Sequence, residues 1–156
     1  MNSTQVLAPV GGRAVPLADV PDPVFSAGMV GHGAAIDPPR EVIDAVAPVS
    51  GKLLKLMPHA YIVMTPDNVG VLVHLGLDTV SLNGDGFTAH VSQGDQVTVG
   101  QVLITYDVPS VEAKGLNPIV PVVVMDEREP GHIVPSEAVL EGAQILSGAD
   151  LFIAHK

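Results

Sequence analysis

Cysteine and tryptophan are absent from this chain of 156 residues. Without cysteine there are no disulfides, no thiolate metal site and no cysteine nucleophile. Aromatic residues make up 3% and charged residues 15% of the chain, whereas hydrophobic residues make up 47%. The core must therefore be built from Val, Leu, Ile and Ala, and this composition favours β-strands over helices.

Long hydrophobic runs are also missing. No run approaches the roughly 18 apolar residues that a membrane helix needs, so we expect a protein that is not embedded in a membrane. Residues 1–5 have no basic start and no apolar signal core follows them, which makes a cytoplasmic location the expectation. Seven Lys and Arg against 17 Asp and Glu give a formal charge of −10 at pH 7. Such a chain repels nucleic acid and suits a protein partner with a basic face.

Turn residues are abundant, with 16 glycines and 14 prolines. Short strands with so many turn signals predict an all-β sandwich or barrel, and the length suits a single domain over residues 1–156. Two very short helices are expected, one after Asp22 as N-cap and one over residues 107–115. Pro121, inside an apolar stretch, indicates an edge strand or a bulge. Two sequence patterns occur twice, which indicates a duplicated β-motif. The repeated pairs are 8–13 with 47–52 and 94–100 with 142–148.

The stretch 59–87 carries most of the chemistry. Two apolar strands are joined there by Pro-Asp-Asn at 66–68, a strong turn signal. If this hairpin turns between the proline and the aspartate, His59 and His74 lie directly opposite each other, with Cβ atoms roughly 4.5–5.5 Å apart. A slip of one residue would place the two side chains on opposite faces. The strands are expected over 60–65 and 69–75.

Paired histidines admit four interpretations. In the first, they are ordinary core or surface residues. In the second, they are metal ligands and need at least a third ligand. In the third, one is a general base that needs a serine and an orienting group. In the fourth, one neutral imidazole carries a phosphoryl group and a nearby donor binds the phosphoryl oxygens. His74 interrupts an apolar strand, where an ionised side chain is costly without partners, and Gly76 permits a close approach to the backbone. The stretch alone does not choose between these interpretations.

Three motifs lie close together in this stretch: His-Ala-Tyr at 59–61, His-Leu-Gly-Leu-Asp-Thr-Val at 74–80 and Leu-Asn-Gly-Asp-Gly-Phe at 82–87. Together they resemble the glucose-type enzyme IIA domain of the bacterial sugar phosphotransferase system. The resemblance covers nearly the whole chain and implies a mostly antiparallel, distorted β-sandwich, or barrel-sandwich hybrid. Further matching segments are 30–36, 47–51, 94–100 and 121–124.

The resemblance implies a phosphotransferase without a cofactor. Neutral His74 would attack the phosphoryl group of phospho-HPr and later give it to a cysteine on the IIB domain of a membrane sugar permease. His59 would donate a hydrogen bond to the phosphoryl oxygens. No metal is required, although the two histidines offer an adventitious zinc site.

The resemblance also implies a docking surface for these partners. Its expected residues are Val30, His32, Val71, Gly76 and Asp78. Residues 31–33 (Gly-His-Gly) are expected to form a tight loop. Family members often have threonine two residues before the first histidine, where Met57 stands, so the group that orients His59 must come from elsewhere. They also commonly have an acidic residue between the two glycines, where His32 replaces that negative charge.

Two other classes share part of the pattern. The His-x-x-x-Asp spacing of His74 and Asp78 occurs in lysostaphin-like zinc peptidases, but the downstream His-x-His pair that those need is absent. Residues 47–51 resemble part of a biotinyl or lipoyl carrier domain. That module needs an exposed lysine at a hairpin tip, whereas Lys52 and Lys55 fall within an expected strand.

Overall fold

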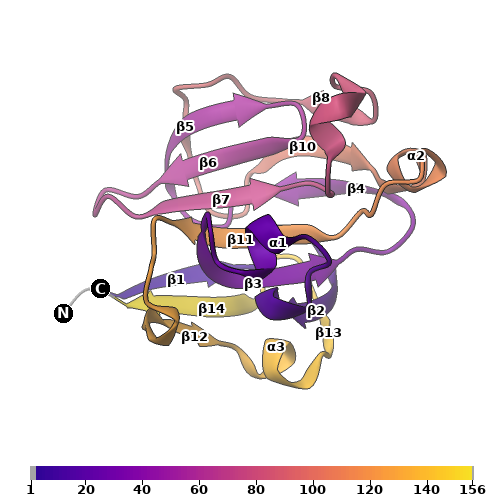
Figure 1. Ribbon diagram of the computed structural model, residues 1–156. Coiled ribbons are helices and arrows are strands. Elements are labelled where there is room, and N and C mark those ends of the chain that lie inside the picture. The colour runs from indigo at the N-terminus through magenta and orange to yellow at the C-terminus, as the bar shows by residue number, and fades with distance from the viewer. Residues whose placement is uncertain (1–2, 156) are drawn as a thin grey trace.

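The computed structural model describes residues 3–155. Met1 and Asn2, where the sequence was searched for an export signal, and Lys156 lie outside the described residues. A large antiparallel sheet curls around a core that two small antiparallel sheets complete (Figure 1). The large sheet has the order β13 (Gln144–Ile145), β2 (Gly12–Pro16), β3 (Gly31–Asp37), β11 (Val120–Met125), β7 (Gly70–His74), β6 (Ala60–Met64), β5 (Gly51–Met57) and β9 (Gln96–Val97). The small sheets have the orders β1 (Ser3–Leu7), β14 (Asp150–His155), β12 (Ile133–Pro135), and β4 (Val42–Val46), β10 (Val102–Asp107), β8 (Phe87–Ala89). The predicted all-β sandwich is confirmed.

Helices are short and few. In the part of the chain from 3 to 155 they are α1 (Pro23–Ser26), α2 (Val108–Ala113), α3 (Glu137–Glu141) and the 3-10 turns η1 (Leu17–Asp19), η2 (Thr79–Leu82) and η3 (Pro130–His132). The side chain of Asp22 accepts a hydrogen bond from the Val24 N–H, which starts α1 as predicted, and Asp107 caps α2 in the same way. Helix α3 was not predicted, although Gly142 ends it at φ 64° as a typical C-terminal signal. None of the helices among these residues is long and apolar enough to cross a membrane.

The large sheet consists of two corresponding halves. Counted inward from the two ends, β13-β2-β3-β11 corresponds to β9-β5-β6-β7. Leu7 N–H donates to the Pro48 carbonyl at 3.0 Å, and the equivalent Val46 N–H donates to the Pro9 carbonyl at 2.9 Å. The predicted duplication is therefore present in the fold as a reciprocal contact between the two copies. Matching hydrogen bonds join Ala8 to Gly148 and Ala149, and Ala47 to Gly100 and Gln101.

Two apolar layers lie on opposite faces of the large sheet, and the strand period of two assigns side chains to them. On β7, Val71 and Val73 belong to the main core inside the curl. Leu72 belongs to a second cluster on the other face, together with Phe25 of α1, and α1 lies over β11 and β3 in Figure 1. His74 follows the alternation of Leu72 and therefore faces the α1 layer.

Two local predictions were wrong. β11 is a central strand, paired with both β3 and β7, and not an edge. Pro121 is tolerated there because pairing with β7 covers only residues 122–124, so the proline lies beyond the end of that ladder. Residues 31–33 are not a loop: they begin β3 and pair with β11.

Candidate active site

The hairpin of β6 and β7 has a register one residue away from the predicted one. His74 lies opposite Ala60, not opposite His59. The loop is the predicted Pro66 to Asn68, but its conformation shifts the register: the Asn68 N–H donates to the Thr65 carbonyl at 3.0 Å, and Asn68 has φ 65°. A turn followed by one left-handed residue is a common three-residue hairpin loop, and it moves the centre of the hairpin onto Asp67.

The two imidazoles nevertheless meet. His59 precedes β6 in a two-residue turn with Pro58, so the strict alternation of the strand does not fix its side chain. Its carbonyl accepts a hydrogen bond from the Leu75 N–H at 2.7 Å, which anchors the turn beside the end of β7. The ring centroids of His59 and His74 are 5.0 Å apart, with an interplanar angle of 71°. The predicted proximity is confirmed, although its predicted cause was wrong.

His74 is oriented by a backbone carbonyl. Its Nδ1 lies 2.6 Å from the Gly76 oxygen, and a carbonyl can only accept, so Nδ1 carries the proton and Nε2 of the neutral ring keeps its lone pair. The Phe25 ring packs on the imidazole, with centroids 5.4 Å apart and a 58° tilt. His74 thus presents its unprotonated Nε2 from an apolar wall.

Electrostatics favour the neutral form of both rings. Burial lowers the pKa of His59, and the neighbouring His74 lowers it further. Burial also lowers the pKa of His74, against smaller raising effects of the Gly76 hydrogen bond and of the Asp22 and Asp78 charges. Because desolvation disfavours the charged imidazolium, both rings remain neutral to lower pH than an exposed histidine.

The loop after β7 holds the Gly76 carbonyl in place. Gly76 has φ +85°, and a Cβ there would lie 2.6 Å from Cγ2 of Thr79, so only glycine fits. Thr79 is fully buried, and its hydroxyl donates to the Leu75 carbonyl at 2.8 Å. Asp78 follows with φ 60° and is exposed.

The structure corrects part of the expected docking surface. Val71 is fully buried in the main core and Gly76 is buried, so neither lies on an exposed surface. Val30 is half-buried against the α1 layer. His32 lies opposite Val124 on β3, which places it two strands away from β7, and its imidazole packs against Gly28.

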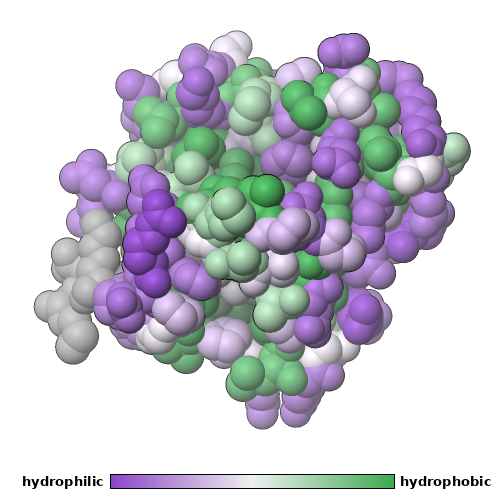
Figure 2. Space-filling view, viewed as in Figure 1, coloured by the Kyte–Doolittle hydropathy of each residue, from purple (hydrophilic) through white to green (hydrophobic). Residues whose placement is uncertain are grey.

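Exposed apolar side chains lie close in sequence to Phe25 and Asp78, and sequence reasoning did not identify them. Val24 and Met29 flank Phe25 of α1, and Val80 follows Asp78; their exposed fractions are 43%, 61% and 65%. Figure 2 shows hydrophobic side chains in the middle of this face, with further ones towards its top and bottom. The recognisable signal was the apolar pattern Val-Phe-x-x-x-Met at 24–29, directly before a motif segment.

The ligands for a permanent metal site are incomplete. Among residues 3–155, no three His, Cys, Asp or Glu side chains are placed to hold one metal ion together. His59 and His74 offer two ligands, so zinc would need further ligands from water or a partner. Lys52 and Lys55 lie within β5 and not at a hairpin tip. The alternatives of a zinc peptidase and a biotinyl or lipoyl carrier are therefore not supported.

Known proteins are similar to this chain in sequence and in fold. A family model described as phosphoenolpyruvate-dependent sugar phosphotransferase system, EIIA 1, matches residues 4–129. A glucose-specific EIIA component from Oceanobacillus iheyensis is 41% identical over 146 residues, which are 90% of this chain and 87% of the relative. A glucose-specific EIIBCA component from Corynebacterium glutamicum is 42% identical over 134 residues, 86% of this chain but 20% of the relative. The solved structure of glucose permease IIA from Mycoplasma capricolum has 35% identity and a TM-score of 0.84, with coverage of 98% of this chain and 96% of that chain.

The family model and the solved structure show that this curled β-sandwich belongs to a class of phosphoryl carrier proteins of sugar phosphotransferase systems. Within that class, the chain belongs to the EIIA 1 family. In the EIIBCA relatives the matching domain is part of one chain with EIIB and EIIC, which supports an EIIB domain as a partner. The predicted family is confirmed.

Proposed function

We propose that His74 is the residue that accepts the phosphoryl group, through Nε2. The observation that carries the proposal is the 2.6 Å contact between Nδ1 and the Gly76 carbonyl, since it leaves the lone pair on Nε2. A lowered pKa keeps this ring neutral at physiological pH, and only the neutral imidazole is a nucleophile.

His59 is proposed to stabilise the phosphoryl group without carrying it. The neutral His59 ring carries one N–H, and its centroid lies 5.0 Å from that of His74, which places a donor beside the proposed phosphoryl group. Met57 at the threonine position of the family supplies no orienting hydroxyl. Packing in the turn after Pro58 and the edge-on contact with His74 hold the ring instead.

The transfer itself is proposed to be an in-line displacement. Nε2 of His74 forms a bond to phosphorus while the bond to the histidine nitrogen of phospho-HPr breaks, and that nitrogen keeps the electron pair. In the second transfer a cysteine thiolate of EIIB attacks phosphorus and Nε2 leaves. Phe25 and its apolar neighbours limit access of water, which slows hydrolysis of the phosphohistidine. No cofactor and no metal take part.

The exposed apolar side chains are proposed to form the docking surface for HPr and EIIB. Val24, Met29 and Val80 supply an apolar contact around His74, and Asp78 adds a negative charge that suits a basic partner. The formal charge of −10 favours encounter with such a partner.

The biological setting is inferred from the relatives. Residues 1–156 are proposed to act as one EIIA domain in the cytoplasm, where phospho-HPr is available. Several relatives are named as glucose-specific components, so glucose is the first sugar to test.

The experiment is phosphorylation with phosphoenolpyruvate, enzyme I and HPr, followed by intact-mass measurement. The native protein should gain the mass of one phosphoryl group, and His74→Ala should gain none. His90→Ala and His132→Ala are matched controls on other elements, and both should still be labelled. Labelling of His74→Ala would refute the assignment.

A further inference from the structure

The loop that contains Gly76 is held from one side by residues 117–119, the segment that leads into β11. The Gly76 N–H donates to the Ile119 carbonyl at 3.1 Å, and the Leu77 N–H donates to the Asn117 carbonyl at 2.8 Å. These bonds extend the contact between the β7 and β11 segments past the end of their ladder. The position of the Gly76 carbonyl therefore depends on the position of 117–119.

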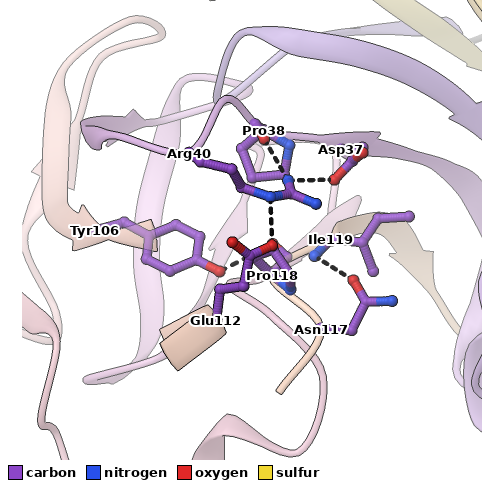
Figure 3. A network of polar contacts seen from close by, with 8 residues as sticks. All are labelled: Asp37, Pro38, Arg40, Tyr106, Glu112, Asn117, Pro118 and Ile119. Atoms are coloured by element: carbon purple, nitrogen blue, oxygen red, sulfur yellow. Dashed lines mark hydrogen bonds and ion pairs between the residues drawn. The ribbon is translucent and has the colours of Figure 1, made fainter. Parts of the chain in front are cut away.

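Two side chains fix this segment in turn (Figure 3). The Tyr106 hydroxyl donates to the Pro118 carbonyl at 2.9 Å, and Oδ1 of Asn117 accepts from the Ile119 N–H at 3.0 Å. The same Tyr106 oxygen would lie only 3.1 Å from a Cβ at Gly76, so it also packs against that glycine. Tyr106 thus contacts both the loop and the segment that supports it.

Tyr106 is itself immobilised. Its side chain is fully buried, and burial raises the pKa of Tyr106, so the hydroxyl remains a donor at physiological pH. Close to it, Arg40 donates to Asp37 and to Glu112, each at 2.7 Å (Figure 3). These contacts tie the β3–β4 connection to α2 beside the tyrosine.

We propose that Tyr106 and Asn117 are positioning residues, which fix the Gly76 carbonyl and thereby hold His74 in the tautomer with the proton on Nδ1. The inference rests on the proposed role of His74 as phosphoryl acceptor. A neutral imidazole with its proton on Nε2 has no lone pair there for phosphorus, so the transfer rate follows the fraction in the correct tautomer.

The test compares two buried tyrosines that each donate to a backbone carbonyl. Tyr106→Phe removes the bond to Pro118, and the control Tyr61→Phe removes a bond of 2.7 Å to the Val46 carbonyl in the main core. The tautomer ratio of His74 is read from the ¹⁵N shifts of its ring in metal-free buffer at a pH where the ring is neutral, and the rate of phosphorylation by phospho-HPr is measured beside it.

The expected result is an increased Nε2–H fraction of His74 in Tyr106→Phe and a rate about two- to tenfold lower, which is the range of one net hydrogen bond. Tyr61→Phe should keep the native tautomer ratio and the native rate within about twofold. An equal response of the two variants, or no change in tautomer ratio in Tyr106→Phe, would overturn the proposal.

Asn117 gives an independent arm at an exposed position. Asn117→Ala loses the acceptor for the Ile119 N–H and should shift the tautomer ratio in the same direction as Tyr106→Phe. Asn117→Asp keeps an acceptor oxygen and should restore the ratio relative to Asn117→Ala. If the native protein takes no phosphoryl group, the proposed function fails, while the tautomer ratios still decide the positioning role.

Discussion

Replacement of Gly76 by alanine should damage the protein in a way that a matched glycine does not. Gly76 and Gly100 have nearly the same φ, +85° and +87°. An L-residue in this region costs about 1–2 kcal/mol of stability, so Gly100→Ala, which meets nothing within 4 Å, should lose about that much.

Gly76→Ala adds a steric term. Its Cβ would lie 2.6 Å from Cγ2 of Thr79, and Thr79 cannot rotate away without losing its bond to the Leu75 carbonyl. Overpacking of this kind costs about 1–3 kcal/mol, so the total loss is about 2–5 kcal/mol. The movement that relieves the contact also displaces the carbonyl that orients His74.

Urea unfolding and phosphorylation by phospho-HPr measure the two consequences. Gly76→Ala should unfold at lower urea than Gly100→Ala and should accept phosphoryl groups more slowly, whereas Gly100→Ala should keep the native rate. If the two variants lose equal stability and transfer at equal rates, the steric argument for Gly76 is refuted.

Three further predictions concern the histidine pair. His59→Ala should still be phosphorylated on His74, but more slowly by about ten- to a hundredfold, because one charge-assisted hydrogen bond of about 1.5–3 kcal/mol is lost; a native rate would exclude the stabilising role. Burial lowers the pKa of both histidines in the folded state, so the unfolded chain binds more protons below about pH 6.5 and stability should fall there. The fall in urea midpoint from pH 7.5 to 5.5 should be smaller in the double variant His59→Asn with His74→Asn, and an unchanged fall would contradict this. Phe25→Ala should speed hydrolysis of the isolated phosphoprotein by admitting water to His74, and an unchanged half-life would remove Phe25 from that role.

Much of the fold could be predicted because its signals are local. Neighbouring residues determine the Asp22 cap of α1 and the strand lengths. Each copy of the duplicated motifs is likewise a short continuous stretch that can be recognised in the sequence. The hairpin register could not be predicted, because Asn68 adopts a left-handed conformation that the turn sequence permits but does not require. The approach of the two imidazoles persists because His59 lies outside the strand.

The parts of the site that sequence reasoning missed depend on contacts between distant segments. Val71 was expected on the surface, yet it belongs to the main core, which is completed by distant residues such as Val6 and Leu151. Phe25 lies on His74 only because the segment between β2 and β3, which contains α1, folds back over the sheet. The link from Tyr106 through residues 117–119 joins segments that no local pattern connects.

The central claim is that Nε2 of His74 carries the phosphoryl group, and long-range ¹H–¹⁵N spectroscopy of the phosphorylated protein tests it most directly. The orientation of the ring by the Gly76 carbonyl predicts ³¹P coupling to Nε2 of His74, with Nδ1 still protonated. Phosphorus on Nδ1 of His74, or on any other histidine, would contradict the account.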